Sequence, residues 1–108
     1  MLPADYVAAL RQDIVFDAEL RGRVFCFHTT WGLFSPREID AGTRLLIAWM
    51  DWDVGDDCLD LGCGYGPIGL ALAAGAPQGH TLMLDKDFVA IEYARRNAEL
   101  NHLPNCTA

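Results

Sequence analysis

The alternation of apolar and polar positions predicts a β-hairpin in the first half of the chain. Two runs of β-branched and aromatic residues, 14–16 and 24–27, flank a polar stretch, Arg21-Gly22-Arg23. Such runs favour strands, and Gly22 can adopt a positive φ in the connection between them. Helical spacing within residues 2–10 predicts a short helix before the hairpin.

A second helix is expected after the hairpin. Residues 29–36 show no hydrophobic period and are predicted to form a loop. Residues 41–50 have helical spacing, and Asp40 can cap that helix by accepting hydrogen bonds from its first free N–H groups. Three apolar side chains share one face of this helix, which we expect to pack in the core: Leu45, Leu46 and Trp49.

The second half of the chain predicts a βαβα unit. The polar residues 51–57 connect it to the first half. The expected elements are a strand at 58–61, a helix at 67–74, a strand at 81–85 and a helix at 88–100 that Asp87 can cap. The second strand is almost entirely apolar, which is typical of a parallel strand that is covered on both faces.

Length and composition fit one folded domain. A chain of 108 residues has room for a single core, and its 52% hydrophobic and 21% charged residues are typical of globular proteins. We therefore interpret residues 1–108 as part of one domain. Residues 1–50 form its N-terminal helix, hairpin, loop and second helix, and residues 57–108 form the βαβα unit.

Charge and cysteine content restrict the partners. The net charge of −7 opposes attraction to phosphate backbones, so we do not expect this segment to grip a nucleic acid. The four cysteines form no C-x-x-C pair that could hold zinc. The N-terminus lacks the features of a signal peptide, and no run reaches the roughly 18 apolar residues that span a bilayer. We expect a protein of the cytoplasm with no membrane partner.

A cluster of glycines between the first strand and helix of the βαβα unit indicates a ligand site. Glycines there let the backbone approach a ligand without a Cβ in the way. The cluster reads as G-x-G-x-G from Gly62, and as the dinucleotide pattern G-x-G-x-x-G from Gly64. Asp85 lies near the roughly 20-residue offset at which a ribose-binding acid follows. Spacing alone leaves both ligand classes open.

Charge favours a cationic ligand at this turn. Asp60 lies two residues before Gly62, where its carboxylate would face the pyrophosphate of a dinucleotide at short range. S-adenosylmethionine carries an ammonium and a sulfonium instead. The two acceptor oxygens of Asp85 could take both ribose hydroxyls of either ligand.

Several blocks of the sequence occur in an order and spacing that can be compared with known families: residues 34–35, 39–46 and 58–69, Asp85, and residues 94–101. Together they resemble the small-domain class I methyltransferases, a family that includes ribosomal small-subunit RNA guanine-N2 methyltransferases. The resemblance implies an α/β fold, a Rossmann-like doubly wound sheet that stops here after its first βαβα unit and follows an N-terminal hairpin and helix. It also implies S-adenosylmethionine as cofactor and RNA as substrate.

The resemblance assigns roles to particular residues. The turn would lie along the methionine and ribose of the cofactor, Asp60 would orient the turn and the amino group, and Asp85 would hold the ribose hydroxyls. Thr30 and Phe34 match family residues that close over the cofactor. The turn residues in this assignment are Gly62, Cys63, Gly64, Tyr65 and Gly66.

The catalytic motif of the family is absent from this sequence. In the family, Asn-Pro-Pro and an aromatic residue follow the fourth strand, whereas Ala108 stands where the third strand begins. We therefore expect no catalytic residue in this segment and interpret it as a methyltransferase fragment. Two alternatives remain: a non-catalytic module that binds S-adenosylmethionine, and an NAD-dependent oxidoreductase, against which Asp60 argues.

Overall fold

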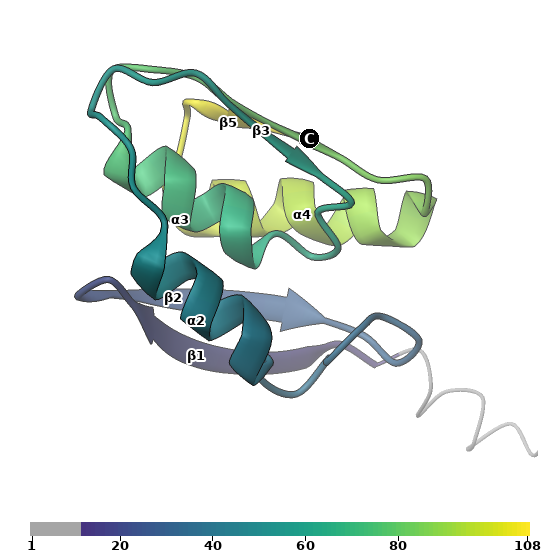
Figure 1. Cartoon of the computed structure of the whole chain (residues 1–108). Helices are drawn as coiled ribbons and strands as arrows, with labels where there is room; N and C mark the ends of the chain where they lie inside the picture. Colours follow the sequence, from purple (N-terminus) through teal and green to yellow (C-terminus); the bar gives the residue numbers. More distant parts are fainter. Residues whose placement is uncertain (1–11) are drawn as a thin grey trace, which may run out of the picture.

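A computed structural model describes residues 12–108, so the helix predicted within residues 2–10 lies outside the described residues. The elements of the described part are β1 (Ile14–Leu20), β2 (Arg23–Thr29), α2 (Ala41–Trp49), β3 (Cys58–Leu61), α3 (Pro67–Gly75), β4 (Thr81–Leu84), α4 (Phe88–Leu100) and β5 (Cys106–Thr107) (Figure 1). None of these helices is both long and apolar enough to cross a membrane.

The predicted hairpin is confirmed. Strands β1 and β2 pair antiparallel, and their last pair is Leu20 with Arg23. The two residues between them both have positive φ, 52° at Arg21 and 81° at Gly22. Two-residue connections with positive φ match the right-handed twist of the strands. The strands extend beyond the apolar runs because Ala18 and Leu20 are also buried.

Helix α2 forms as expected, but the prediction of its buried face is wrong. Asp40 Oδ2 caps the helix by accepting a hydrogen bond from Thr43 N at 3.2 Å. The helix packs against α3 and β1 and buries Ile47. The side chains expected in the core are exposed instead: Leu45 by 62%, Leu46 by 50% and Trp49 by 81%. The neighbouring elements decide which face is buried, and the apolar residues of this helix occupy more than one face.

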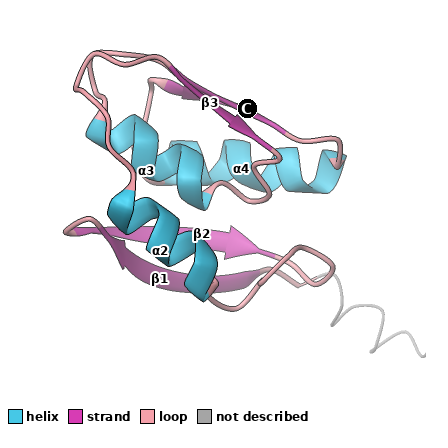
Figure 2. Ribbon diagram, viewed as in Figure 1, coloured by secondary structure: helices cyan, strands magenta, loops and turns pink. Residues whose placement is uncertain are grey.

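The βαβα unit is confirmed, and its two strands form a three-stranded parallel sheet with β5. The strand order is β3-β4-β5, with Cys58 beside Thr81 and Thr81 beside Cys106. Helices α3 and α4 both lie against the same face of this sheet (Figures 1 and 2). On its other side α4 contacts β2 of the hairpin. The carboxyl ends of β3 and β4 therefore open toward the turns that precede α3 and α4.

The other face of the sheet is not covered by any helix within residues 12–108. The expectation that both faces of the second strand are covered therefore does not hold for this part of the chain. Side chains toward α3 and α4, such as Met83, are fully buried. Those on the open face are exposed: Leu59 by 58%, Leu61 by 77%, Leu82 by 38% and Leu84 by 41%.

We expect this open leucine face to cause self-association of the 108-residue chain, because contiguous apolar surface favours contact with other molecules. Threonine keeps strand propensity and removes much of the apolar area. The double variant Leu61→Thr/Leu84→Thr should weaken association at least tenfold, or about 1.4 kcal/mol, in sedimentation equilibrium. Val15→Thr, an exposed change on the hairpin, is the control. A wild-type chain that stays monomeric at every concentration would contradict the prediction.

Candidate functional site

The glycine turn leaves open space above part of its backbone. It follows β3, and the amides of Gly62 and Cys63 donate to Leu84 O at 2.7 and 2.9 Å. A Cβ added at Gly62 or Gly64 would have no heavy atom of another residue within 4 Å beyond its immediate chain neighbours. A Cβ at Gly66 would instead lie 2.8 Å from Leu70 Cδ1. The first two glycines therefore leave room for a ligand, and the third is required by packing.

Asp85 holds the turn from the end of β4. Its Oδ2 accepts a hydrogen bond from Gly64 N, and its Oδ1 accepts one from Asp87 N, both at 2.9 Å. The backbone N–H groups of Asp87 and Gly64 lower the pKa of this carboxyl. Each carboxylate oxygen has two lone pairs, so each can accept one further hydrogen bond. Asp85 is thus a fixed, ionised group with acceptor capacity to spare.

Asp60 lies behind the turn and caps α3. The side chain is only 6% exposed, and its Oδ2 accepts a hydrogen bond from Gly69 N at 2.9 Å. Gly69 is the third residue of α3, whose own N-cap, Gly66, has no side chain to perform this role. Burial raises the pKa of Asp60, and the charge of Asp85 adds to the shift. Asp60 therefore fixes the turn against α3 through a bond made from the preceding strand.

A cavity of about 350 Å³ opens over the turn, within the size range of small-molecule sites. Six residues expected at the cofactor line it: Phe34, Gly62, Cys63, Gly64, Tyr65 and Asp85. Three others do not: Thr30, Asp60 and Gly66. A larger hollow of about 710 Å³, beside α4 and the residues that follow it, contains none of the expected site residues.

The remaining cavity wall comes largely from the N-terminal ends of three helices. Asp40 and Thr43 belong to the start of α2, Pro67 to that of α3, and Asp87 to that of α4. With Asp85, the wall contains three aspartates and one lysine, Lys86. The sequence identified Asp40 and Asp87 as helix caps, but it gave no sign that both caps face one cavity.

Cys63 is unsuited to nucleophilic chemistry. Its side chain is 5% exposed, and burial together with the charges of Asp60 and Asp85 raises the pKa of the thiol to about 12. A thiol must lose its proton to act as a nucleophile. This residue therefore contributes backbone to the cavity wall and an uncharged side chain to the core.

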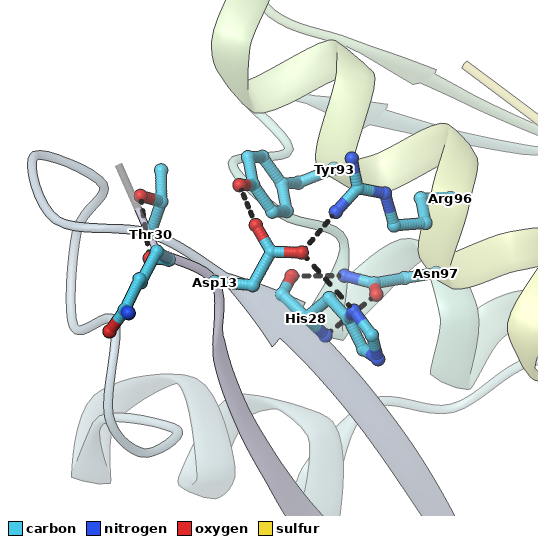
Figure 3. A network of polar contacts seen from close by, with 7 residues as sticks. Asp13, His28, Thr30, Tyr93, Arg96 and Asn97 are labelled. Carbon is cyan, nitrogen blue, oxygen red and sulfur yellow. Dashed lines mark hydrogen bonds and ion pairs between the residues drawn. The ribbon is translucent and has the colours of Figure 1, made fainter. Parts of the chain in front are cut away.

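Thr30 does not line the cavity and lies near a polar network around Asp13 (Figure 3). Its hydroxyl donates to Gln12 O at 3.4 Å. Beside it, Asp13 accepts hydrogen bonds from the hydroxyl of Tyr93 and from Arg96. The bond from Tyr93, followed by the charge of Arg96, lowers the pKa of the Asp13 carboxyl. In this structure Thr30 belongs to the junction between the start of β1, the end of β2 and α4.

The sequence of this chain matches a family model. The model describes the methyltransferase small domain, and residues 24–108 match it. The chain belongs to this family. The matched range includes α2, the whole βαβα unit and β2 except its first residue, so it contains every residue that lines the cavity.

Curated relatives of this methyltransferase small domain are longer proteins. The uncharacterized protein YbxB of Bacillus subtilis is 42% identical over 87 residues, which are 80% of this chain and 43% of YbxB. The ribosomal RNA small subunit methyltransferase C of Hamiltonella defensa is 33% identical over 103 residues, covering 91% of this chain and 31% of the relative. The chain thus spans less than half the length of these relatives.

Solved structures share the fold. The T. thermophilus 16S rRNA N2 G1207 methyltransferase (RsmC), in complex with AdoMet and guanosine, superposes with a TM-score of 0.77 at 25% identity, covering 89% of this chain and 27% of that one. M. jannaschii TYW2, in complex with AdoMet, superposes with a TM-score of 0.65 at 18% identity. The match covers 88% of this chain and 42% of TYW2. The predicted α/β fold of the class I methyltransferases is confirmed.

Proposed function

We propose that this chain is the cofactor-binding part of an S-adenosylmethionine-dependent RNA methyltransferase. The observation that carries the proposal is the cavity over the glycine turn. Its floor has open space at Gly62 and Gly64, and its wall contains three carboxylates. Membership of the methyltransferase small domain family supports the same assignment.

The residues of the cavity fit S-adenosylmethionine, the AdoMet of the similar structures. When bound, this cofactor supplies an electrophilic methyl group on a sulfonium. Asp85 has one free lone pair on each oxygen and would accept from the two ribose hydroxyls. Gly62 and Gly64 let the backbone approach the ligand, and Phe34, which is 78% exposed at the cavity, would cover it. Asp60 would act through the turn that it fixes.

The charge of the cavity favours this ligand over a dinucleotide. Asp40, Asp85 and Asp87 face the cavity with Lys86 as the one basic residue of its wall. Carboxylates attract an ammonium and a sulfonium and repel a pyrophosphate, and the interaction strengthens where water is partly excluded. Asp60, on which the sequence placed this argument, is buried behind the turn and does not line the cavity, so these three residues carry the argument in its place.

RNA, with guanine N2 as the methylated atom, is our proposed substrate. The support is the name of the Hamiltonella defensa relative and the guanosine in the T. thermophilus complex. The net charge of −7 indicates that other parts of a longer protein would provide the RNA-binding surface. No residue of this chain is proposed to be catalytic.

Titration calorimetry with S-adenosylhomocysteine and with NAD tests the cofactor. We expect the chain to bind the first and not the second. Asp85→Asn should weaken binding at least 100-fold, about 2.8 kcal/mol, because a charged acceptor of two hydroxyls is lost. Asp51→Asn, a change at an exposed acid outside the cavity, should leave affinity unchanged.

Two outcomes would count against the proposal. Binding of NAD in preference to S-adenosylhomocysteine would overturn it in favour of an oxidoreductase. An Asp85→Asn variant that binds as tightly as wild type would place the ligand elsewhere. A transfer assay with labelled S-adenosylmethionine and guanosine-containing RNA tests the alternative of a pure binding module, which predicts binding by the full-length protein without methyl transfer.

A further inference from the structure

Asn97 of α4 and Asn101, the C-cap residue of this helix, hold the edge of β2 as a neighbouring strand would. Asn101 Oδ1 accepts from Cys26 N at 2.9 Å, and its Nδ2 donates to Cys26 O at 2.8 Å. Asn97 makes the same pair of bonds with His28, at 2.8 and 2.9 Å. Four helical residues rise about 6 Å and two strand residues about 6.7 Å, so the two spacings nearly match.

Asn97 also reaches the glycine turn, whereas Asn101 does not. Asn97 Nδ2 donates to Tyr65 O at 2.8 Å, and Asn97 is fully buried. The remaining side-chain bond of Asn101 goes to the last turn of α4, where its Nδ2 donates to Asn97 O. Figure 3 shows Asn97 pointing from α4 to the backbone of His28. One amide group therefore joins the end of β2 to the turn that forms the cavity floor.

Tyr65 continues this connection to the opposite wall of the cavity. Its hydroxyl donates to Ser35 O at 2.9 Å and lies 3.3 Å from Glu38 O, in the loop that follows β2. The ring is 3% exposed and packs edge-on against Phe27. Burial raises the pKa of this hydroxyl, so it remains a hydrogen-bond donor. Tyr65 is thus bound at its carbonyl by Asn97 and at its hydroxyl by the loop.

We propose that Asn97 is a positioning residue for the cofactor cavity. Acting through Tyr65 and His28, it sets the distance between the glycine turn and the loop that carries Gly32, Leu33 and Phe34. This inference rests on the proposed function, since it assumes that the cavity between the two walls receives S-adenosylmethionine. Asn97 does not line the cavity, yet the inference makes it one of the residues that determine cofactor affinity.

Asn101→Ala is a matched control for Asn97→Ala, because both remove two bonds to β2 from the same helix face. We expect both variants to lose thermal stability. Only Asn97→Ala should weaken binding of S-adenosylhomocysteine, by at least tenfold in calorimetry below the melting temperature. Asn101→Ala should stay within twofold of wild type. Tyr65→Phe keeps the ring and removes the bond to the loop, so it tests the same connection if Asn97→Ala does not fold.

Hydrogen exchange in the absence of ligand separates this inference from the proposed function. Amide exchange at Gly64, Gly66 and Leu33 should become at least tenfold faster in Asn97→Ala and stay unchanged in Asn101→Ala. If exchange is faster in Asn97→Ala alone but the wild-type chain does not bind S-adenosylhomocysteine, the proposed function is wrong and the positioning role of Asn97 still holds. Equal exchange and equal affinity in the two alanine variants would overturn the positioning role.

Discussion

Replacing Gly66 with alanine should lower the free energy of unfolding by about 2–5 kcal/mol. Gly66 has a φ of 105°, and an added Cβ would lie 2.8 Å from Leu70 Cδ1 and 3.2 Å from Met83 Sδ. Both neighbours are fully buried, so a shift of either side chain would disturb the packing of the core. Left-handed backbone costs about 1–2 kcal/mol for a residue with a Cβ, and overpacking adds about 1–3. Urea unfolding followed by tryptophan fluorescence measures the loss.

Gly64→Ala provides the contrast within the same turn. Gly64 also has positive φ, 57°, but its Cβ would enter open space at the cavity. We expect a stability loss of only about 1–2 kcal/mol and a fall of at least tenfold in affinity for S-adenosylhomocysteine. If both alanine variants lost stability equally and kept their affinity, the division of the turn into a ligand-facing part and a packing part would be wrong.

The local elements were predictable because their signals are local. The turn at Arg21-Gly22 and the caps at Asp40 and Asp87 each depend on residues within a few positions of one another. The βαβα unit was predictable because the patterns of its strands, glycine turn and helices succeed one another along the sequence. The buried face of α2 was not predictable in this way, since Trp49 is exposed or buried according to the elements that pack against the helix.

The site was predictable in part for the same reason. The glycine turn and Asp85 lie in recognisable positions at strand ends, so the sequence predicted that they lie close together, and both line the cavity. Asn97 contacts residues 69 and 32 positions away, and no local pattern encodes such contacts. One signal was available: Asn97, and Asn101 one turn later, lie beside the alanines on the buried side of α4, where a polar side chain needs a partner. Thr30, the residue after β2, does not line the cavity, and its hydroxyl donates to Gln12 O instead.

The second large effect is expected at Asp60, where alanine should lower the free energy of unfolding and asparagine should not. Asp60→Ala leaves the buried N–H of Gly69 without its acceptor, which costs about 1–3 kcal/mol. Asp60→Asn keeps an acceptor oxygen of the same shape and removes a buried charge. We expect this variant to match or exceed the unfolding free energy of wild type at pH 7, by up to about 1 kcal/mol.

The pH dependence of these variants distinguishes a buried charge from a simple cap. Burial raises the folded pKa of Asp60 above its ordinary value of 3.8, so folding favours the protonated carboxyl. The associated stability is present below pH 3.8 and is lost as pH rises through the folded pKa. Relative to Asp60→Asn, wild type should therefore lose stability across that window and then stay level. Urea unfolding of both proteins from pH 3 to 8 measures the difference.

A difference that does not change with pH would show that Asp60 acts only as a hydrogen-bond acceptor for α3. If the free energy of unfolding of wild type instead rose relative to that of Asp60→Asn with increasing pH, the N-terminal end of α3 would stabilise the charge of Asp60 more than burial destabilises it.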